Sequence, residues 1–183
     1  KQPDMKITID KNVIHYLIKM IFLYTATEKF DSTHDKDGMS WKKYIEWSRL
    51  YHLTELVSLD GILNKILVEP DYDNADDWNF IHTFEQYQTG FFTNIEYVFK
   101  RQKNKNKFNL LTVVVKPDQN CKNINIDEHE FVGYDLLDQG FGISALANCG
   151  GFDETFSAAD LNDKGLIDDF LKAYDIKKRL LEN

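Results

Sequence analysis

The sequence predicts an α+β domain in which N-terminal and C-terminal helices cover a small antiparallel sheet of three or four strands. Helical periodicity marks both ends of the chain, and strand-like runs lie between them. Residues 110–115 read LLTVVV, a β-branched run closed by a proline. Two further apolar runs, 131–137 and 143–148, flank a five-residue break that contains glycines, which is typical of a hairpin. These three runs are the predicted strands.

The helices are predicted from the spacing of apolar residues. After a candidate cap at Asp10, residues 13–24 repeat apolar side chains at the i, i+3, i+4 spacing of a helix. Ser40 is a candidate cap for a second helix, and residues 91–99 carry a third apolar face that ends in cationic residues. Residues 166–181 predict the last helix, with an apolar stripe that includes Phe170, Tyr174 and Ile176 opposite its charged residues.

Composition predicts one globular domain spanning residues 1–183, because 13 Phe, 9 Tyr and 3 Trp are enough for a sizeable core. The net charge of -8 disfavours nonspecific nucleic-acid binding and suits either a soluble protein or one with a basic partner. Two cysteines are too few for a disulfide framework or a zinc site, and no segment is apolar enough to span a membrane. We expect a cytoplasmic protein without a metal or cofactor.

An acidic loop after residue 68 is the candidate binding segment. Acidic loops can bind a basic protein or a hard cation, and the alternative is that the carboxylates are simply solvated. The candidate binding residues are Glu69, Asp71, Asp73, Asp76, Asp77 and Trp78.

Cys149 is the candidate nucleophile. It lies at the end of a predicted strand, before two glycines and a predicted helix start, where backbone N–H groups can lower the pKa of a thiol. A cysteine nucleophile needs a base, and His129 is the histidine nearest to it in the sequence. The alternative is a buried thiol in the core, the usual place of a free cysteine.

Two other acidic patterns have competing interpretations. Residues 160–168 resemble the first half of a calcium loop, but Lys164 stands at a ligand position, so a turn with Gly165 in a left-handed conformation fits better. Asp135 and Asp138 lie on or beside the predicted hairpin, where they serve either acid–base chemistry or protection of a strand edge.

Three functional hypotheses remain open. The first is an acidic protein-interaction domain, in one version an immunity-type or antitoxin-type inhibitor of a basic partner. The second is a thiol-dependent hydrolase or transferase centred on Cys149, and the third is a ligand-sensing domain. The sequence lacks the common phosphate-loop, dinucleotide, zinc-protease and serine-hydrolase motifs, so an enzyme is the less favoured class.

Overall fold

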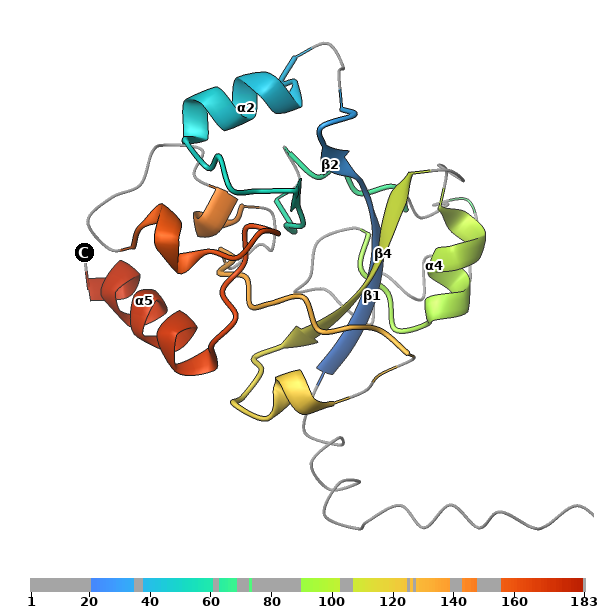
Figure 1. The fold of residues 1–183 in the computed structure, drawn as a ribbon. Coiled ribbons are helices and arrows are strands. Elements are labelled where there is room, and N and C mark those ends of the chain that lie inside the picture. Colours follow the sequence, from blue (N-terminus) through green and yellow to red (C-terminus); the bar gives the residue numbers. More distant parts are fainter. Residues whose placement is uncertain are drawn as a thin grey trace, which may run out of the picture.

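The computed structural model describes residues 21–34, 38–60, 63–68, 73, 90–102, 107–124, 126, 128–138, 143–147 and 156–182 (Figure 1). Within these residues the chain is α+β, with three α-helices and two antiparallel sheets of two strands each. The strands are β1 (Ile21–Glu28), β2 (Phe30–Asp31), β3 (Glu55–Leu56) and β4 (Phe108–Val115). The helices are α2 (Trp41–Ser48), α4 (Ile95–Arg101) and α5 (Phe170–Glu182).

β1 and β4 form an antiparallel ladder along their whole length. The register pairs Ile21 with Val115 and Glu28 with Phe108, and the two strands run through the middle of the molecule (Figure 1). The predicted strand at 110–115 is confirmed, and β4 starts slightly earlier, at Phe108. Its β-branched residues fit the extended backbone of a half-buried strand.

The predicted N-terminal helix is wrong where the structure describes it, because residues 21–24 belong to β1. Leu23, Thr25, Ala26 and Thr27 are all fully buried, so both faces of this strand are covered. A strand buried on both faces loses its alternation of apolar and polar residues and then resembles a buried helix segment. Residues 1–20, which hold the rest of that prediction, lie outside the described part of the chain.

The second edge of β1 is also hydrogen-bonded. Tyr24 N donates to Phe92 O at 2.6 Å, and Phe92 N donates back to Tyr24 O at 2.9 Å. Further along the strand, Leu67 N donates to Ala26 O at 2.8 Å. β1 is therefore a central strand, with β4 on one edge and two short chain segments on the other.

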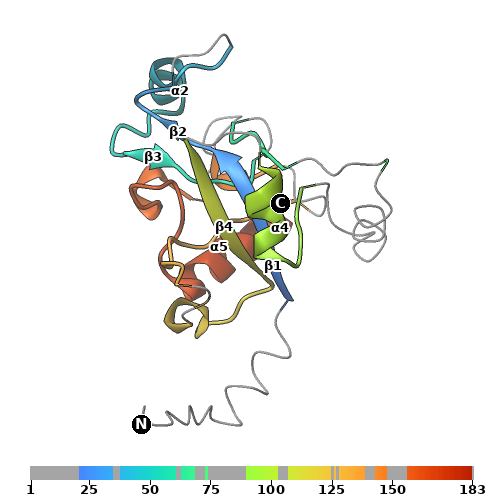
Figure 2. The same cartoon turned by 90° about the vertical axis from the view of Figure 1, so that its right-hand side faces the viewer.

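α4 and α5 lie on opposite sides of the β1–β4 ladder, as Figures 1 and 2 show together. α4 packs directly on β1, since Val98 belongs to the same apolar cluster as Ala26. α5 contributes Ala173 and Ile176 to the largest apolar cluster, which is built mainly from α2 and irregular segments. Among the described residues, no helix has the length and apolar character needed to cross a membrane.

The predicted strand at 131–137 is reduced to isolated bridges. Tyr134 pairs with Ile167 rather than with β4, and Tyr134 N donates to Ile167 O at 2.8 Å. The backbone explains the interruption, because Gly133 has a φ of +144°, which side-chain-bearing residues rarely adopt. A glycine in this conformation breaks the regular strand geometry just before the bridge.

The predicted strand at 143–148 is also reduced, to a single bridge between Ser144 and Leu137. Ala145–Ala147 then form a 3-10 turn, and residue 148 lies outside the described residues. The Ser144 hydroxyl accepts a hydrogen bond from Leu146 N at 3.1 Å, which stabilises the turn in place of a ladder. The two segments of the predicted hairpin therefore meet at one β-bridge and do not form a ladder.

One predicted helix cap is confirmed, and two of the predicted helices start later than expected. Ser40 accepts a hydrogen bond from Lys43 N at the start of α2, as its position in the sequence predicts. α4 starts later than predicted, after the Asn94 cap. α5 starts at Phe170 rather than at residue 166, because the preceding residues pair with the segment around Tyr134.

The close approach of two backbones at Gly133 can be tested by substitution. A Cβ at this position would lie 2.5 Å from Leu166 Cβ, and neither atom can move without its main chain. We expect Gly133→Ala to lower the free energy of unfolding by about 3 kcal/mol or more. Gly38→Ala is the control, since its φ is +110° but its Cβ would meet nothing within 4 Å, and it should cost about 1–2 kcal/mol. Equal losses in urea denaturation would contradict the predicted clash.

Candidate functional site

Most of the predicted site residues lie outside the described part of the chain. These are Cys149 and five members of the acidic loop, Glu69, Asp71, Asp76, Asp77 and Trp78. The loop member that is described, Asp73, is exposed. The thiol and acidic-loop hypotheses therefore stay predictions.

His129, the predicted base, is bound to the β1–β4 ladder. Its Nδ1 shares a hydrogen bond with the hydroxyl of Thr112 on β4. Its backbone N donates to Ile126 O at 2.8 Å, which closes a short turn in which Glu128 has a φ of +60°. These contacts give the ring a structural role in holding the loop against the sheet.

A half-buried carboxylate lies where the sequence predicts either acid–base chemistry or edge protection. Asp135 is partly covered, and each of its oxygens accepts two hydrogen bonds. One oxygen accepts from Ser58 Oγ at 3.1 Å and Leu59 N at 3.2 Å. The other accepts from Leu136 N at 2.8 Å and from the Ser144 hydroxyl. Burial raises the pKa of Asp135 above its usual range, although these four hydrogen bonds oppose the shift.

Asp60 extends this group into a cluster of two carboxylates and two serines. Asp60 is fully buried, and it accepts from Ser144 N and Leu63 N, both at 3.2 Å. Ser58 Oγ, besides donating to Asp135, accepts from Asp60 N at 3.1 Å. The cluster thus joins three chain segments, two of which also meet at the bridge between Leu137 and Ser144. Its described contacts are those of a structural clamp, because buried polar groups of irregular segments need such partners.

The calcium-like segment is a turn held by its own side chains. Asn162 Oδ1 accepts from Lys164 N at 2.9 Å and from Leu166 N at 3.0 Å. Gly165 has a φ of +76°, so the predicted left-handed glycine is confirmed. Lys164 points to Glu55, with their charged atoms 3.6 Å apart. Across the described residues, no three His, Cys, Asp or Glu side chains gather in the way that a metal site requires.

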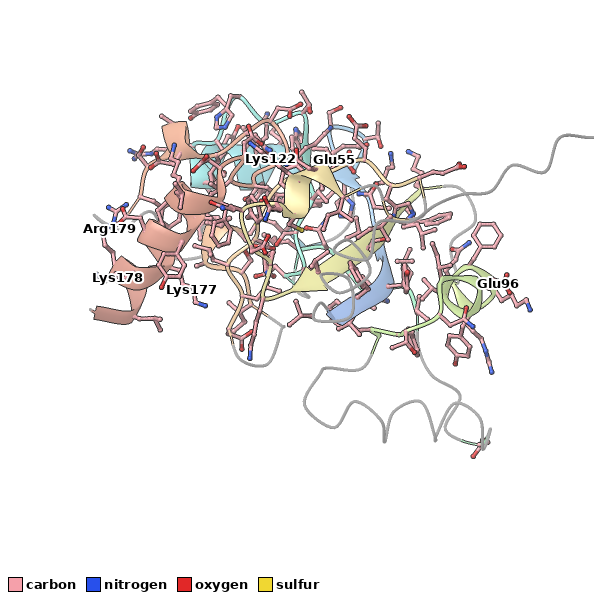
Figure 3. The ribbon with its side chains drawn as sticks, turned by 90° about the horizontal axis from the view of Figure 1, so that it is seen from below. Glu55, Glu96, Lys122, Lys177, Lys178 and Arg179 are labelled. Carbon is pink, nitrogen blue, oxygen red and sulfur yellow. The ribbon has the colours of Figure 1, made fainter. Side chains whose placement is uncertain are left out.

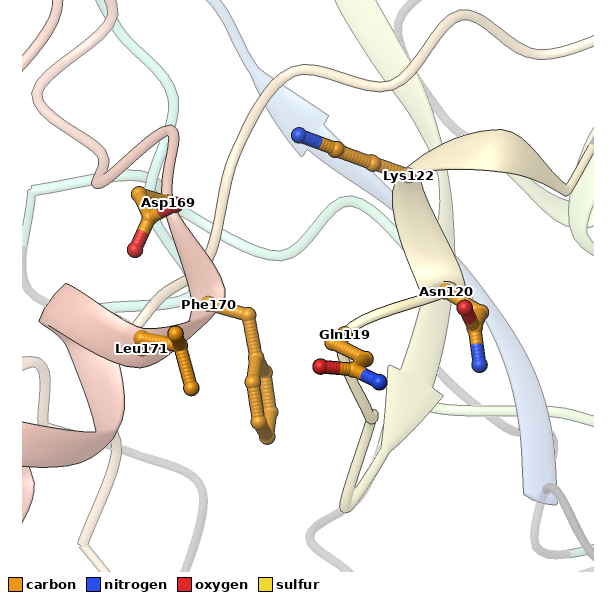
Figure 4. Close-up of a pocket in the computed structure, with 6 residues that line it drawn as sticks. All are labelled: Gln119, Asn120, Lys122, Asp169, Phe170 and Leu171. Atoms are coloured by element: carbon orange, nitrogen blue, oxygen red, sulfur yellow. The ribbon is translucent and has the colours of Figure 1, made fainter.

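A shallow hollow of about 230 Å³ lies between the start of α5 and the loop after β4 (Figure 4). Phe170 and Leu171 form its apolar side, and the side chain of Lys122 extends from the opposite loop towards the start of α5. The hollow is lined by Gln119, Asn120, Lys122, Asp169, Phe170 and Leu171. It combines apolar surface with amide, ammonium and carboxylate groups, a mixture typical of a protein-contact surface.

α5 carries a second apolar face that continues from this hollow. Ala173 and Ile176 are buried, whereas Leu171 is 65%, Tyr174 60% and Leu181 77% exposed. The three exposed residues are spaced by three and by seven positions, so they follow one line on the helix surface. We call these three residues the α5 outer face.

The aromatic member of the α5 outer face is held by the core beneath it. The ring of Tyr174 stacks on Phe170, with centroids 6.2 Å apart and an interplanar angle of 28°. Phe170 in turn packs edge-to-face against the buried ring of Tyr134, at 5.7 Å. A surface ring fixed in this way loses little conformational freedom on binding.

Sequence reasoning missed the α5 outer face because it placed Tyr174 on the buried stripe. The signal was present, since Leu171 and Leu181 are apolar residues that fall outside that stripe. The clamp was not predicted: Asp135 was singled out for acid–base chemistry or edge protection, and neither Ser58, which donates to it, nor Asp60, which is linked to it through Ser58, was singled out. Those partners are distant in sequence, and no periodic pattern links them to Asp135.

The raised pKa of Asp135 predicts how the stability of the fold depends on pH. Its pKa is raised in the folded state, so the folded chain holds the proton more tightly than the unfolded chain. The stability due to this proton is complete at and below its ordinary pKa near 4 and is lost as pH rises through the folded pKa.

Asp135→Asn removes that titration and turns an amide N–H towards two donors, so we expect a loss of about 1–3 kcal/mol of unfolding free energy. The gap between the original chain and this variant should be larger at pH 4 than at pH 7. Urea denaturation at both pH values measures it, and a gap that stays constant or widens with rising pH would refute the assignment.

The sequence matches no protein-family model, and comparison with curated proteins and with solved structures likewise finds no match.

Proposed function

We propose that this chain is a protein-interaction domain that binds its partner through the α5 outer face and the adjoining hollow. The observation that carries the proposal is that one helix has two apolar faces, one in the core and one exposed beside a concave surface. Contiguous exposed apolar residues with a polar rim are a feature of protein contact sites.

Side-chain chemistry supports the same proposal. Tyrosine is enriched among the residues that dominate binding energy, and Tyr174 is held in place by Phe170. Figure 3 shows Lys177, Lys178 and Arg179 projecting from the same helix, on the side of the molecule away from Glu96 on α4. Lys177 and Lys178 border the α5 outer face and provide its polar rim, whereas Arg179 pairs with Asp175 on its own helix.

A narrower version of the proposal is an inhibitor that covers a basic partner protein. It is supported by the net charge of -8, which attracts a basic protein at long range. In this version the acidic loop from Glu69 to Trp78 supplies a second contact area, of which Asp73 is exposed.

Photo-crosslinking in cells of the source organism tests the proposed surface. Tyr174 is replaced by p-benzoylphenylalanine, and in a second variant the same probe replaces Phe99, an apolar residue of α4 with 62% exposure. We expect one protein adduct of defined mass at position 174 and none at position 99. Adding Leu171→Asp should remove the adduct, because a carboxylate at the rim of the hollow must lose its water on docking.

Two results would refute this function. One is the absence of any adduct at position 174, and the other is an adduct that survives Leu171→Asp. Circular dichroism of the Leu171→Asp chain is the folding control, and we expect an unchanged spectrum because Leu171 is exposed and lies in the first turn of α5.

A further inference from the structure

We infer that the inner face of β1 binds an ordered water molecule between the side chains of Thr25, Thr27 and Asn64, and that this water joins β1 to the neighbouring loop. All three side chains are fully buried. Among the residues that the structure describes, no group forms a hydrogen bond with either threonine hydroxyl or with the amide oxygen of Asn64. Polar groups buried this deeply are nearly always satisfied, by the protein or by bound water.

The register of β1 places the two threonines on one face. Side chains two positions apart on a strand point the same way, so Thr25 and Thr27 share the face of Leu23. Leu23 packs with Leu59 in an apolar cluster, whereas Ala26 on the opposite face packs under α4. The two hydroxyls therefore point away from α4 into apolar surroundings, where a hydroxyl without a partner is costly.

Asn64 lies beside the same face of the strand. Its amide nitrogen donates to Leu56 O at 2.8 Å and to Glu28 O at 3.4 Å, and Glu28 directly follows Thr27. Exchanging the nitrogen and oxygen of this amide would set an acceptor against two carbonyl oxygens, so the two contacts fix its orientation. Thr27 also forms an antiparallel bridge with Ile66, which places Asn64 diagonally across from it. The amide oxygen of Asn64 is therefore an acceptor close to Thr27 that needs a donor.

Distance favours a water molecule over a direct hydrogen bond between the two hydroxyls. Residues two positions apart on a strand are separated by about 7 Å, which is beyond the reach of two threonine hydroxyls for each other. A water molecule with hydrogen bonds of about 2.8 Å joins oxygens up to about 5.6 Å apart, so it fits between hydroxyls that lean towards one another.

The number and kind of groups also suit one water molecule. A buried water typically forms about three hydrogen bonds, and the site offers two hydroxyls and one amide oxygen. A hydroxyl both donates and accepts, whereas the oxygen of Asn64 only accepts. The water therefore donates to Asn64 and to one threonine and accepts from the other threonine, which satisfies all three groups.

The bound water ties β1 to the loop that carries part of the clamp around Asp135. Asn64 N donates to Asp60 O at 2.9 Å, and Asp60 is one of the two carboxylates of that clamp. Asn64 also bonds Leu56 on β3, so the water site connects both sheets with the clamp. The water lowers the cost of burying the three polar groups, and its own immobilisation offsets part of that gain.

Oxygen-17 relaxation dispersion of the full chain tests for the water, because it measures water molecules held inside a protein and does not respond to exchanging hydroxyl protons. We expect Thr27→Val to lower the dispersion amplitude by the contribution of one water, and Thr27→Ser, which keeps the hydroxyl, to retain it. Thr33→Val is the matched control and should change nothing, since the Thr33 hydroxyl is exposed and bonds Asp31 at 2.7 Å. An equal amplitude in the original chain and Thr27→Val overturns the inference.

The sign of a stability change gives a second readout. If the Thr27 hydroxyl binds the water, Thr27→Val leaves the amide oxygen of Asn64 without a donor and should raise the unfolding equilibrium constant about tenfold. If the hydroxyl has no partner at all, the same substitution removes a buried unsatisfied group and lowers that constant. Urea denaturation separates the two cases, and a lowered constant refutes the water site.

A double variant tests whether the two threonines share one water molecule. Thr25→Val should raise the unfolding equilibrium constant by a factor similar to that of Thr27→Val. The double variant should raise it by less than the product of the two factors, because either substitution alone already disrupts the shared water. Factors that multiply fully would contradict a single site between the two residues.

Discussion

The described structure depends on β1 being bonded along both edges. β4 satisfies one edge in a continuous ladder, and Phe92 and Leu67 bond the other from two separate segments. Since the strand is also covered on both faces, it is the element around which sequence-distant segments assemble. This position has a cost, because the hydroxyls of Thr25 and Thr27 are buried without a hydrogen-bond partner in the described part of the chain. The surrounding apolar packing must offset that cost.

Away from β1, hydrogen bonds from side chains to the backbone, rather than β-ladders, hold the chain segments together. The clamp around Asp135 and Asp60 supplies partners for backbone N–H groups that no sheet reaches, and Asn162 does the same in the turn before α5. Such contacts are specific to one geometry, since a hydroxyl or a carboxylate forms only a few hydrogen bonds, each with a preferred direction. The described part of the C-terminal region is therefore ordered without regular strands, and its order depends on a small number of polar side chains.

This difference explains what could be predicted from the sequence. β4, the Ser40 cap, the left-handed Gly165 and most of α5 follow from local pattern and local chemistry, and the structure contains all of them. β1 could not be recognised, because burial on both faces removed its period. The predicted hairpin is reduced for a different reason. The conformation of Gly133 and the pairing of Tyr134 with Ile167 depend on contacts between segments distant in sequence, which local pattern does not reveal. For the same reason Asp135 could be singled out, but its environment could not be derived.

α5 links the fold to the proposed interaction, and its short length makes it depend on the core for stability. A helix of 13 residues is marginal in isolation, so its order comes from packing of Ala173 and Ile176 in the core. The outer face is consequently formed before any partner arrives, and Tyr174 is fixed through Phe170 to the same core. Docking on a preformed face does not require a folding step, which favours rapid and reversible contact over obligate assembly.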